Sequence, residues 1–462
     1  MPNTCLLLSS PRLGRTFPRG VMSIASYLEA HGYPTTVLPL AYSLDPAPSS
    51  EGLTLEHEKQ IEARLAAAVQ RTHPTVVGIG NPYTLDFPDC LKILAICKRL
   101  DAGLTTVIGG PHVTFQDVEC LQAPQVDVVV RGEGEWTMLD LMTALEQGRH
   151  LSSVAGISFR QDGQIVRTPA RPLGDLGEFP PLNFGLLPAD YMRQALVYGI
   201  SSRGCAYRCS YCVERAFWQR WRPYPISRLV DEIETLAHQY DNQMLGFFES
   251  MIDTRTSPLF ALCSALTERG LSLRPDFYLH VRADRITTDS VAAMRRAGIG
   301  QVDMGVESVS PRVLAMMDRT VTAEQVAAAC RLLRAGGIKV HTYWIVGHPG
   351  DTPEESDNSF RFLKYLLEHD LTQTAEVMIF QPYPGTCFFE EPAKYGVEIL
   401  HRDWSKWKRF RTHPPSQLTD FSADEIYAAW ERFNHLLTTW QRLPHLNRRA
   451  FAWAPVSPDV PD

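Results

Sequence analysis

The sequence predicts an α/β protein made of two parallel sheets in tandem, a doubly wound N-terminal sheet and then a partial (β/α)6 barrel with a short helical C-terminal region. Two observations carry this prediction. Short runs rich in β-branched residues alternate with helix-length amphipathic segments along most of the chain. A Pro- and Gly-rich stretch at residues 151–190 separates two such series, so the connection between domains is expected there.

The first series occupies residues 1–150 and predicts a ligand-binding sheet. Its expected strands are residues 4–9, 35–40, 75–79, 105–108 and 126–130, and its expected helices are residues 20–31, 55–70, 89–100 and 136–146. Glycine and polar residues follow the third, fourth and fifth strands. Because ligands of open α/β sheets bind at the carboxyl ends of the strands, this edge is the predicted binding site.

The second series predicts the barrel, at residues 191–395. Six strands are expected at residues 196–202, 244–249, 276–281, 301–306, 339–346 and 376–381, with helices at residues 226–240, 290–297 and 323–335 between some of them. The linker should contain a β-hairpin about Asp162-Gly163. Residues 396–462 complete the chain as a Trp-rich helical region whose Pro-rich tail is expected to fray.

Composition excludes several classes of protein. With 44% hydrophobic and 21% charged residues the chain is an ordinary globular protein, and a net charge of −7 without long single-sign runs argues against a nucleic-acid binder and favours a small-molecule substrate. The apolar stretch before Pro11 is too short for a signal peptide or a membrane span, which predicts a cytoplasmic protein.

Three of the ten cysteines cluster, in the segment RGCAYRCSYC at residues 203–212. Thiolates from Cys205, Cys209 and Cys212 could satisfy three irons of a [4Fe–4S] cubane and leave the fourth open. A zinc site normally needs four protein ligands, and no second pair lies nearby; zinc and three unligated thiols remain the alternatives. The other seven are isolated and read as small buried residues: Cys5, Cys90, Cys97, Cys120, Cys263, Cys330 and Cys387.

The cysteine spacing CxxxCxxC, with the aromatic Tyr211 before the last cysteine, resembles the cluster loop of the radical S-adenosylmethionine (SAM) superfamily. Further segments similar to that family follow in order over roughly residues 195–390: FFESMID at 247–253, RAD at 282–284, GVESVS at 305–310, IVGHPGDT at 345–352 and PYPGT at 382–386. The resemblance implies that SAM chelates the open iron and is reductively cleaved to methionine and a 5′-deoxyadenosyl radical.

The resemblance also implies a set of SAM-binding residues. Glu307 would accept hydrogen bonds from the ribose, Tyr211 would pack near adenine, and Gly347 would let the backbone approach the cofactor. The ordinary alternatives are a solvated carboxylate, a core-filling ring and a plain turn.

Two further residues are assigned to the methionyl group of SAM. Glu249 would bind its amino group, unless it caps a helix or forms a salt bridge, and Arg282 would hold its carboxylate, unless it pairs with Asp284. The sequence singles out no residue that acts on the substrate itself.

The first series resembles the cobalamin-binding domain that precedes many radical SAM domains, through VIGGPHVT at residues 107–114 and VDVVVRGEGE at 126–135. No Asp-x-His-x-x-Gly motif occurs, so no histidine is marked as the axial ligand, and the domain could have lost the corrin. The residues that the resemblance assigns to cobalamin are Asn81, Gly109, Gly110, His112, Gly132 and Glu133.

The resemblance therefore implies a cobalamin-dependent radical SAM enzyme that methylates an unactivated carbon of a small natural-product-type molecule. A flavodoxin- or ferredoxin-type protein would supply the electrons. One alternative is a radical SAM dehydratase of a sugar that needs no cobalamin, as in aminoglycoside biosynthesis. Another is a non-enzymatic iron–sulfur or zinc-binding scaffold.

Overall fold

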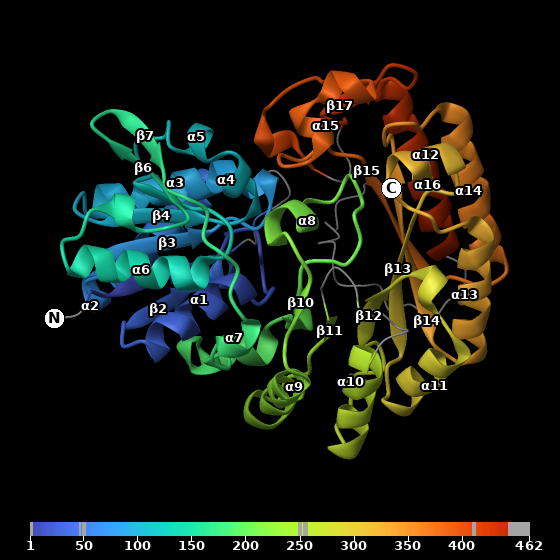
Figure 1. Cartoon of the computed structure of the whole chain (residues 1–462), viewed down its shortest axis with the longest axis horizontal. Helices are drawn as coiled ribbons and strands as arrows, with labels where there is room; N and C mark the ends of the chain where they lie inside the picture. The colour runs from blue at the N-terminus through green and yellow to red at the C-terminus, as the bar shows by residue number, and fades with distance from the viewer. Residues whose placement is uncertain are drawn as a thin grey trace.

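A computed structural model describes residues 3–45, 48, 52–247, 252, 257–408 and 413–441. The chain forms two halves that lie side by side, an N-terminal α/β half and a barrel half (Figure 1). Within the described ranges, no helix has both the length and the apolar character needed to cross a membrane.

The N-terminal half is built on a seven-stranded sheet of order β2-β1-β3-β4-β5-β6-β7. The first five strands are parallel, which confirms the predicted doubly wound sheet. The hairpin predicted about Asp162-Gly163 is also present, as two antiparallel strands that extend the sheet at one edge. The strands are β1 Cys5–Leu8, β2 Thr35–Leu38, β3 Val76–Gly80, β4 Thr105–Gly109, β5 Val128–Val130, β6 Ile157–Gln161 and β7 Gln164–Arg167.

Helices cover both faces of this sheet, which explains why β1 is buried along its whole length. The longer helices are α1 Arg19–Ala30, α2 Leu55–Thr72, α3 Phe87–Leu100 and α6 Gly134–Glu146. Two short helices, α4 Pro111–Phe115 and α5 Asp117–Cys120, follow β4 and α7 Ala189–Gln194 leads into the barrel half.

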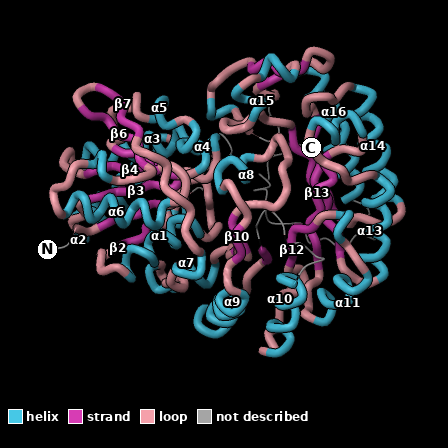
Figure 2. Tube along the Cα trace, in the orientation of Figure 1, coloured by secondary structure: helices cyan, strands magenta, loops and turns pink. Residues whose placement is uncertain are grey.

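The barrel half contains six parallel strands in the order β15-β14-β13-β12-β11-β8, which confirms the predicted partial barrel. They are β8 Tyr198–Gly199, β11 Gly246–Phe247, β12 Tyr278–Val281, β13 Gln301–Glu307, β14 Lys339–Val346 and β15 Thr374–Ile379. Figure 2 shows the helices on the outer side of these strands. The helices are α9 Ile226–Tyr240, α10 Ser257–Glu268, α11 Thr288–Arg296, α12 Pro311–Met316, α13 Ala323–Ala335 and α14 Pro353–Glu368.

The C-terminal region is less purely helical than predicted. Helix α16, Ala423–Gln441, is present and packs on the barrel, where the Trp430 indole N–H donates to the Val377 carbonyl at 2.8 Å. Before it come the short helix α15, Cys387–Glu390, and an antiparallel pair, β16 Val397–Ile399 and β17 Ser416–Leu418. Three-residue strands are too short to leave a period-two pattern in the sequence. The tail expected to fray lies outside the described residues.

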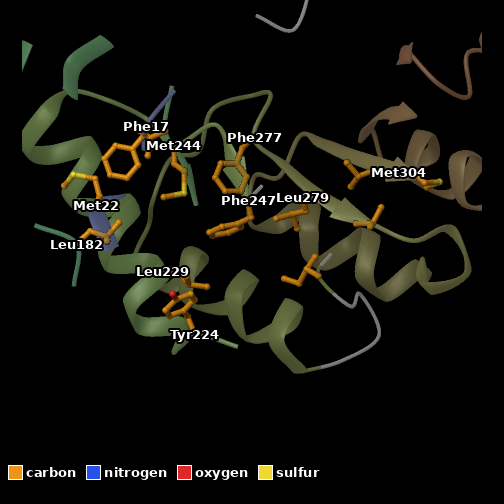
Figure 3. Close-up of a cluster of buried hydrophobic side chains, with 14 of the residues drawn as sticks. Phe17, Met22, Leu182, Tyr224, Leu229, Met244, Phe247, Phe277, Leu279 and Met304 are labelled. Carbon is orange, nitrogen blue, oxygen red and sulfur yellow. The ribbon is translucent and has the colours of Figure 1, made fainter. Parts of the chain in front are cut away.

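One hydrophobic cluster runs through both halves. Phe17 and Met22 from the N-terminal half belong to it together with Met244 and Phe247 from the barrel half, as Figure 3 shows. The two halves therefore pack against each other through a shared apolar core.

A buried ion-pair network also crosses between the halves. Arg203 lies in β9, Ser202–Arg203, which pairs antiparallel with β10, Arg222–Pro223. Its guanidinium contacts Glu133 at 3.1 Å and also binds Glu135, while Arg222 binds Glu133 at 3.1 Å. The Ser23 hydroxyl donates to Glu135 at 2.5 Å. All four charged side chains are at most 9% exposed, so each depends on its partners for neutralisation.

Replacing Glu135 by alanine should lower the free energy of unfolding by about 3–5 kcal/mol, because it leaves part of the Arg203 charge buried without a partner. The double variant Glu135→Leu/Arg203→Met should lose less than the single variant, since it removes both charges. Urea denaturation followed by circular dichroism measures both. If both variants lose the same free energy of unfolding, the unpaired Arg203 charge is not the cause of the destabilisation.

Candidate active site

The three clustered cysteines lie on a loop between β9 and α8, Val213–Trp218, which we call the cysteine loop (residues 205–212). The barrel fixes this loop from the other side. The Ser210 hydroxyl donates to the Met316 carbonyl at 2.6 Å, and the Ser210 amide donates to the Met317 carbonyl at 3.1 Å. Two short strands and these bonds therefore place the loop over the carboxyl ends of the barrel strands.

All three thiols of the cysteine loop are partly exposed and line one cavity of about 160 Å³. Burial raises the pKa of Cys205 and of Cys212, so these thiols stay protonated until a metal ion displaces their protons. Among the described residues no group of His, Cys, Asp and Glu converges tightly enough to hold a single ion. A cubane takes each thiolate at a different iron, so the three thiols need not converge on one point to hold it.

Glu307 ends β13 in a strained conformation inside the same cavity. Its φ of +65° is unusual for a residue with a side chain, and the β13–β14 register shifts between Gly305 and Glu307. A Cβ atom at Gly305 would lie 2.4 Å from Oε1 of Glu307, so a side chain at this position would displace the Glu307 carboxylate. Burial raises the pKa of Glu307, and the nearby Arg319 opposes the rise. The Tyr211 hydroxyl donates to Glu307 at 3.0 Å.

Arg319 is a cavity residue that sequence reasoning missed. It comes from the loop after α12, and its Nη1 lies 3.6 Å from Oε1 of Glu307, 3.3 Å from the Tyr211 hydroxyl and 3.9 Å from Sγ of Cys209. Its side chain is only 6% exposed. No spacing rule marks this position, because the residue reaches the thiols through the fold of the chain.

Arg282 also lines the cavity, but it pairs with Asp284 in the way that the ordinary alternative expects. Nε and Nη2 donate to the two carboxylate oxygens at 2.9 and 3.2 Å, and the guanidinium lies 3.9 Å from the centre of the Tyr207 ring. The binding of a ligand carboxylate by Arg282 stays a prediction.

Two predicted SAM residues are not brought to this cavity by the described structure. Gly347 packs against α16, where a Cβ atom would lie 2.8 Å from the Ile426 side chain, and its amide donates to Asp351 at 2.9 Å. Glu249 falls outside the described residues.

The inner wall of the barrel carries polar groups beneath the thiols. His280 of β12, Asp303 of β13 and Tyr343 of β14 all line the cavity. The Tyr343 hydroxyl and the Gln301 amide each donate to Asp303 at 2.9 Å, and burial raises the pKa of Asp303 to about 7. Sequence reasoning missed this group. The sequence pattern that could have indicated it is a period-two alternation in β13, which places Gln301 and Asp303 on one side of an otherwise apolar strand.

A second cavity, of about 390 Å³, lies at the carboxyl edge of the N-terminal sheet and is also lined by Tyr198 and Trp218 of the barrel half. Its lining includes five residues predicted to contact cobalamin: Asn81, Gly109, Gly110, Gly132 and Glu133.

Asn81 gives this second cavity an open hydrogen-bonding position. The residue is fully buried, its amide nitrogen donates to the Tyr83 carbonyl at 2.9 Å, and its Oδ1 has no partner among the described residues. Gly110 packs directly against Asn81. Its φ is +131°, and a Cβ atom at this position would lie 2.2 Å from the Asn81 carbonyl oxygen. A buried acceptor facing an amide-rich ligand such as a corrin is a chemical fit.

His112 and Glu133 have other partners than the sequence suggested. His112 is absent from the cavity lining and packs between the rings of Phe87 and Trp404, with centroids at 4.8 and 4.9 Å. Burial lowers the pKa of His112 to about 3, so the imidazole is neutral. Glu133 lines the cavity but is held in the ion-pair network of Arg203.

The two cavities adjoin at α8. Glu214, in the first turn of this helix, lines both of them. A ligand at the thiols and a ligand on the N-terminal sheet would therefore meet across one side chain.

The buried Asp303 predicts a pH-dependent stability difference. Its pKa is raised in the folded state, so the folded chain keeps a proton that the unfolded chain loses; stability falls as pH rises from about 4 to about 7 and then levels off. The slope is on the order of 1 kcal/mol per pH unit. Asp303→Asn should lack this component, so unfolding curves of variant and wild type should diverge across that interval. If the free energies of unfolding of variant and wild type instead change in parallel with pH, the pKa of Asp303 is not raised in the folded state.

Comparisons with known proteins agree with this architecture. The family model of the radical SAM superfamily matches residues 200–363, and that of the B12 binding domain matches residues 8–142. An uncharacterized methyltransferase of Pyrococcus horikoshii is 29% identical over 368 residues, 78% of each chain. An anaerobic magnesium-protoporphyrin IX monomethyl ester cyclase of Rubrivivax gelatinosus is 30% identical over 390 residues, 81% of this chain and 66% of the relative's length.

Solved structures share the fold over nearly the whole chain. The radical SAM methyltransferase TsrM of Kitasatospora setae, with tryptophan and a SAM analogue bound, superposes with a TM-score of 0.72 at 19% identity and covers 92% of this chain and 89% of its own. The cobalamin-dependent radical enzyme OxsB superposes with a TM-score of 0.69 at 17% identity. The match covers 94% of this chain and 66% of the OxsB chain. Both family models and the relatives lead to one conclusion: the chain is an enzyme of the radical SAM superfamily that carries an N-terminal B12-binding domain.

Proposed function

We propose that the protein is a cobalamin-dependent radical SAM methyltransferase that acts on an unactivated carbon of a small molecule. The observation that carries the proposal is the junction of the two cavities at Glu214. A methyl carrier on the N-terminal sheet and a radical generator at the thiols would face a substrate placed between them. Such a site must exclude water, because a primary alkyl radical reacts with loose groups.

In this proposal Cys205, Cys209 and Cys212 hold a [4Fe–4S] cluster. When bound, the cluster supplies an electron that cleaves SAM to methionine and a 5′-deoxyadenosyl radical. The protein contributes the binding of SAM. Arg319 and Arg282 would supply positive charge to bind the SAM carboxylate, since a guanidinium fork suits a carboxylate.

Glu307 would accept hydrogen bonds from the ribose hydroxyls, and Tyr211 would hold Glu307 in place through its hydroxyl, in addition to the predicted contact with adenine. Gly347 would support this edge of the barrel from outside the cavity. The proposed role of Glu249, which is to bind the amino group of SAM, rests on the family resemblance.

Cobalamin would occupy the larger cavity, where it serves as the methyl carrier when bound. Asn81 would offer its open acceptor to a corrin amide, and the glycine backbone at Gly109, Gly110 and Gly132 would let the ring approach the sheet. His112 would fix its loop by ring packing. A relative with a named reaction, the cytidylyl-2-hydroxyethylphosphonate methyltransferase of Streptomyces wedmorensis, is 24% identical over 75% of this chain and supports methyl transfer.

The cyclase of Rubrivivax gelatinosus, at 30% identity, favours a second candidate in which the radical step occurs without net methyl transfer. A sugar dehydratase would be another reaction of this kind. S-adenosylhomocysteine separates the candidates, since it forms only when SAM donates its methyl group.

A low-potential cluster needs an electron donor, and we propose a flavodoxin- or ferredoxin-type protein for that role. Because a cluster with an open iron is oxygen-labile, a reducing cytoplasmic location suits the enzyme. The small volume of the thiol cavity and the absence of long basic runs in the sequence support a small-molecule substrate rather than a nucleic acid.

Cys209→Ala should abolish the formation of 5′-deoxyadenosine from SAM under dithionite, because two thiolates do not hold the cluster in a cleavage-competent state. Iron and sulfide content should fall with it. Cys330→Ala is the matched control, since Cys330 is a buried cysteine of α13 outside both cavities. If Cys209→Ala cleaves SAM as the control does, the cluster assignment is wrong.

Asn81→Leu should weaken corrin binding by about two- to tenfold, the effect of one lost hydrogen bond, and leave the iron content unchanged. The exposed Asn358 of α14 provides the control variant Asn358→Leu. Corrin is measured by its absorbance after anaerobic purification in excess hydroxocobalamin. Wild-type protein that retains no corrin, or produces no S-adenosylhomocysteine during turnover, would favour the second candidate.

A further inference from the structure

Polar side chains on the inner wall of the barrel have no role in the proposed binding of SAM or cobalamin. Asp303 of β13 stands beside His280 of β12 in the strand register, and Tyr343 of β14 pairs with Gly305, two residues further along β13. The side chains of Asp303, His280 and Tyr343 line the thiol cavity together with the three cysteines. We call these three residues the Asp303 cluster.

Asp303 is a buried carboxyl whose hydrogen-bond donors are neutral. The Gln301 amide donates to Oδ1 at 2.9 Å, and the Tyr343 hydroxyl donates to Oδ2 at 2.9 Å. Nε2 of His280 lies 3.8 Å from Oδ2, which is too far for a hydrogen bond. In the part of the chain that the structure describes, no lysine or arginine pairs with Asp303. Each carboxylate oxygen can therefore accept a further hydrogen bond from a ligand.

A buried carboxylate needs a positive charge nearby or it keeps its proton. Glu307, in the same cavity, lies 3.6 Å from Arg319. Asp303 has no such partner among the described residues. Burial raises its pKa to about 7, and the charge of Glu376 on the neighbouring β15 adds to the rise. A cation that enters the cavity would replace the proton that Asp303 otherwise keeps.

Aromatic rings surround the carboxyl group. The Tyr278 ring stacks on the His280 ring with centroids 5.7 Å apart, and the His280 ring lies 6.0 Å from that of Tyr343. His341 contacts the other side of the Tyr343 ring at 4.7 Å, and burial lowers the pKa of His341 to about 3, so this histidine supplies no positive charge. Aromatic faces and a carboxylate together attract an organic ammonium group.

We propose that the Asp303 cluster binds a protonated amine of the substrate, so that the substrate is an amine-bearing small molecule. This inference rests on the proposed function and names its substrate class. The ammonium N–H groups would donate to the Asp303 oxygens, and the rings of His280 and Tyr343 would pack against the adjoining carbon atoms. Asp303 would hold the substrate in one orientation, with no bond formed or broken at the carboxylate.

A metal ion fits the Asp303 cluster less well than an amine does. A divalent cation needs several ligands at short distance, and no group of His, Cys, Asp and Glu in the described ranges converges in that way. An ammonium group needs one carboxylate and tolerates aromatic neighbours, which is the set of groups present at Asp303.

Two probes of nearly equal shape test the proposal. Benzylamine is cationic at about pH 8, whereas benzyl alcohol is neutral, and Asp303 is mostly ionised at that pH. Wild-type enzyme with its cluster reconstituted should bind benzylamine about tenfold or more tightly than benzyl alcohol, because a hydrogen bond between two charged groups is stronger than one to a neutral donor. Titrations followed by NMR of the probes measure both dissociation constants.

Two variants locate the cation. Asp303→Asn keeps the size of the side chain and removes its charge, so the preference for benzylamine should disappear while benzyl alcohol binds as before. Asp289→Asn is the matched control, since Asp289 is an exposed aspartate of α11, and it should keep the full preference. Circular dichroism and iron content check that both variants are folded and carry the cluster.

An excess of SAM separates the substrate amine from the amino group of SAM itself. Because the proposed SAM contacts are Glu307, Arg319 and Arg282, saturating SAM should leave the affinity for benzylamine unchanged. If SAM displaces benzylamine, the probe occupied the place of the SAM amino group and the proposal is overturned.

The remaining outcomes are equally decisive. Equal or undetectable binding of the two probes to wild type overturns the amine site, and so does a preference that survives in Asp303→Asn. The binding test requires no turnover, so it fails separately from the proposed function. Enzyme that shows the expected preference but forms neither 5′-deoxyadenosine nor S-adenosylhomocysteine would contradict the proposed function and leave the amine site in place.

Discussion

The buried ion-pair network around Arg203 is the constraint on which the arrangement of the site depends. Arg203 stands two residues before the first clustered cysteine, and its partners Glu133 and Glu135 follow the last parallel strand of the N-terminal sheet. Charges buried this deeply cannot move apart without losing the partners that neutralise them. The network therefore fixes the distance between the cysteine loop and the carboxyl edge of the N-terminal sheet, and with it the junction of the two cavities.

The two cavities that meet at this junction differ in the residues that line them. The thiol cavity is lined by charged groups, with Glu307, Arg319 and Arg282 close to the cysteines. The larger cavity is lined mainly by apolar surface, and its polar groups include Glu133 and Glu135 of the Arg203 network and the open acceptor of Asn81. A polar zwitterion suits the first lining, and a wide amide-fringed ring suits the second. The lining of each cavity thus matches the ligand proposed for it.

Polar residues inside the barrel give the site a further property. A barrel interior is ordinarily filled by branched apolar side chains, yet here His280, Asp303 and Tyr343 line it below the thiols. Burying an ionisable carboxyl has a cost in stability, which the hydrogen bonds from Tyr343 and Gln301 only partly offset. Such a group is expected where a ligand needs orienting, and the fold tolerates it because the surrounding core is large and continuous.

The sequence by itself determined both sheets, most of their strands and the cysteine loop, because hydrophobic period and ligand spacing are local properties of the chain. It also marked Glu307 and Asn81, which follow strands whose ends could be located. Only the tertiary structure decided that Arg319 reaches Cys209, that His112 turns away from the cavity and that Glu214 borders both sites. These contacts join residues that are distant in sequence, and no local pattern records which distant side chains packing will bring together.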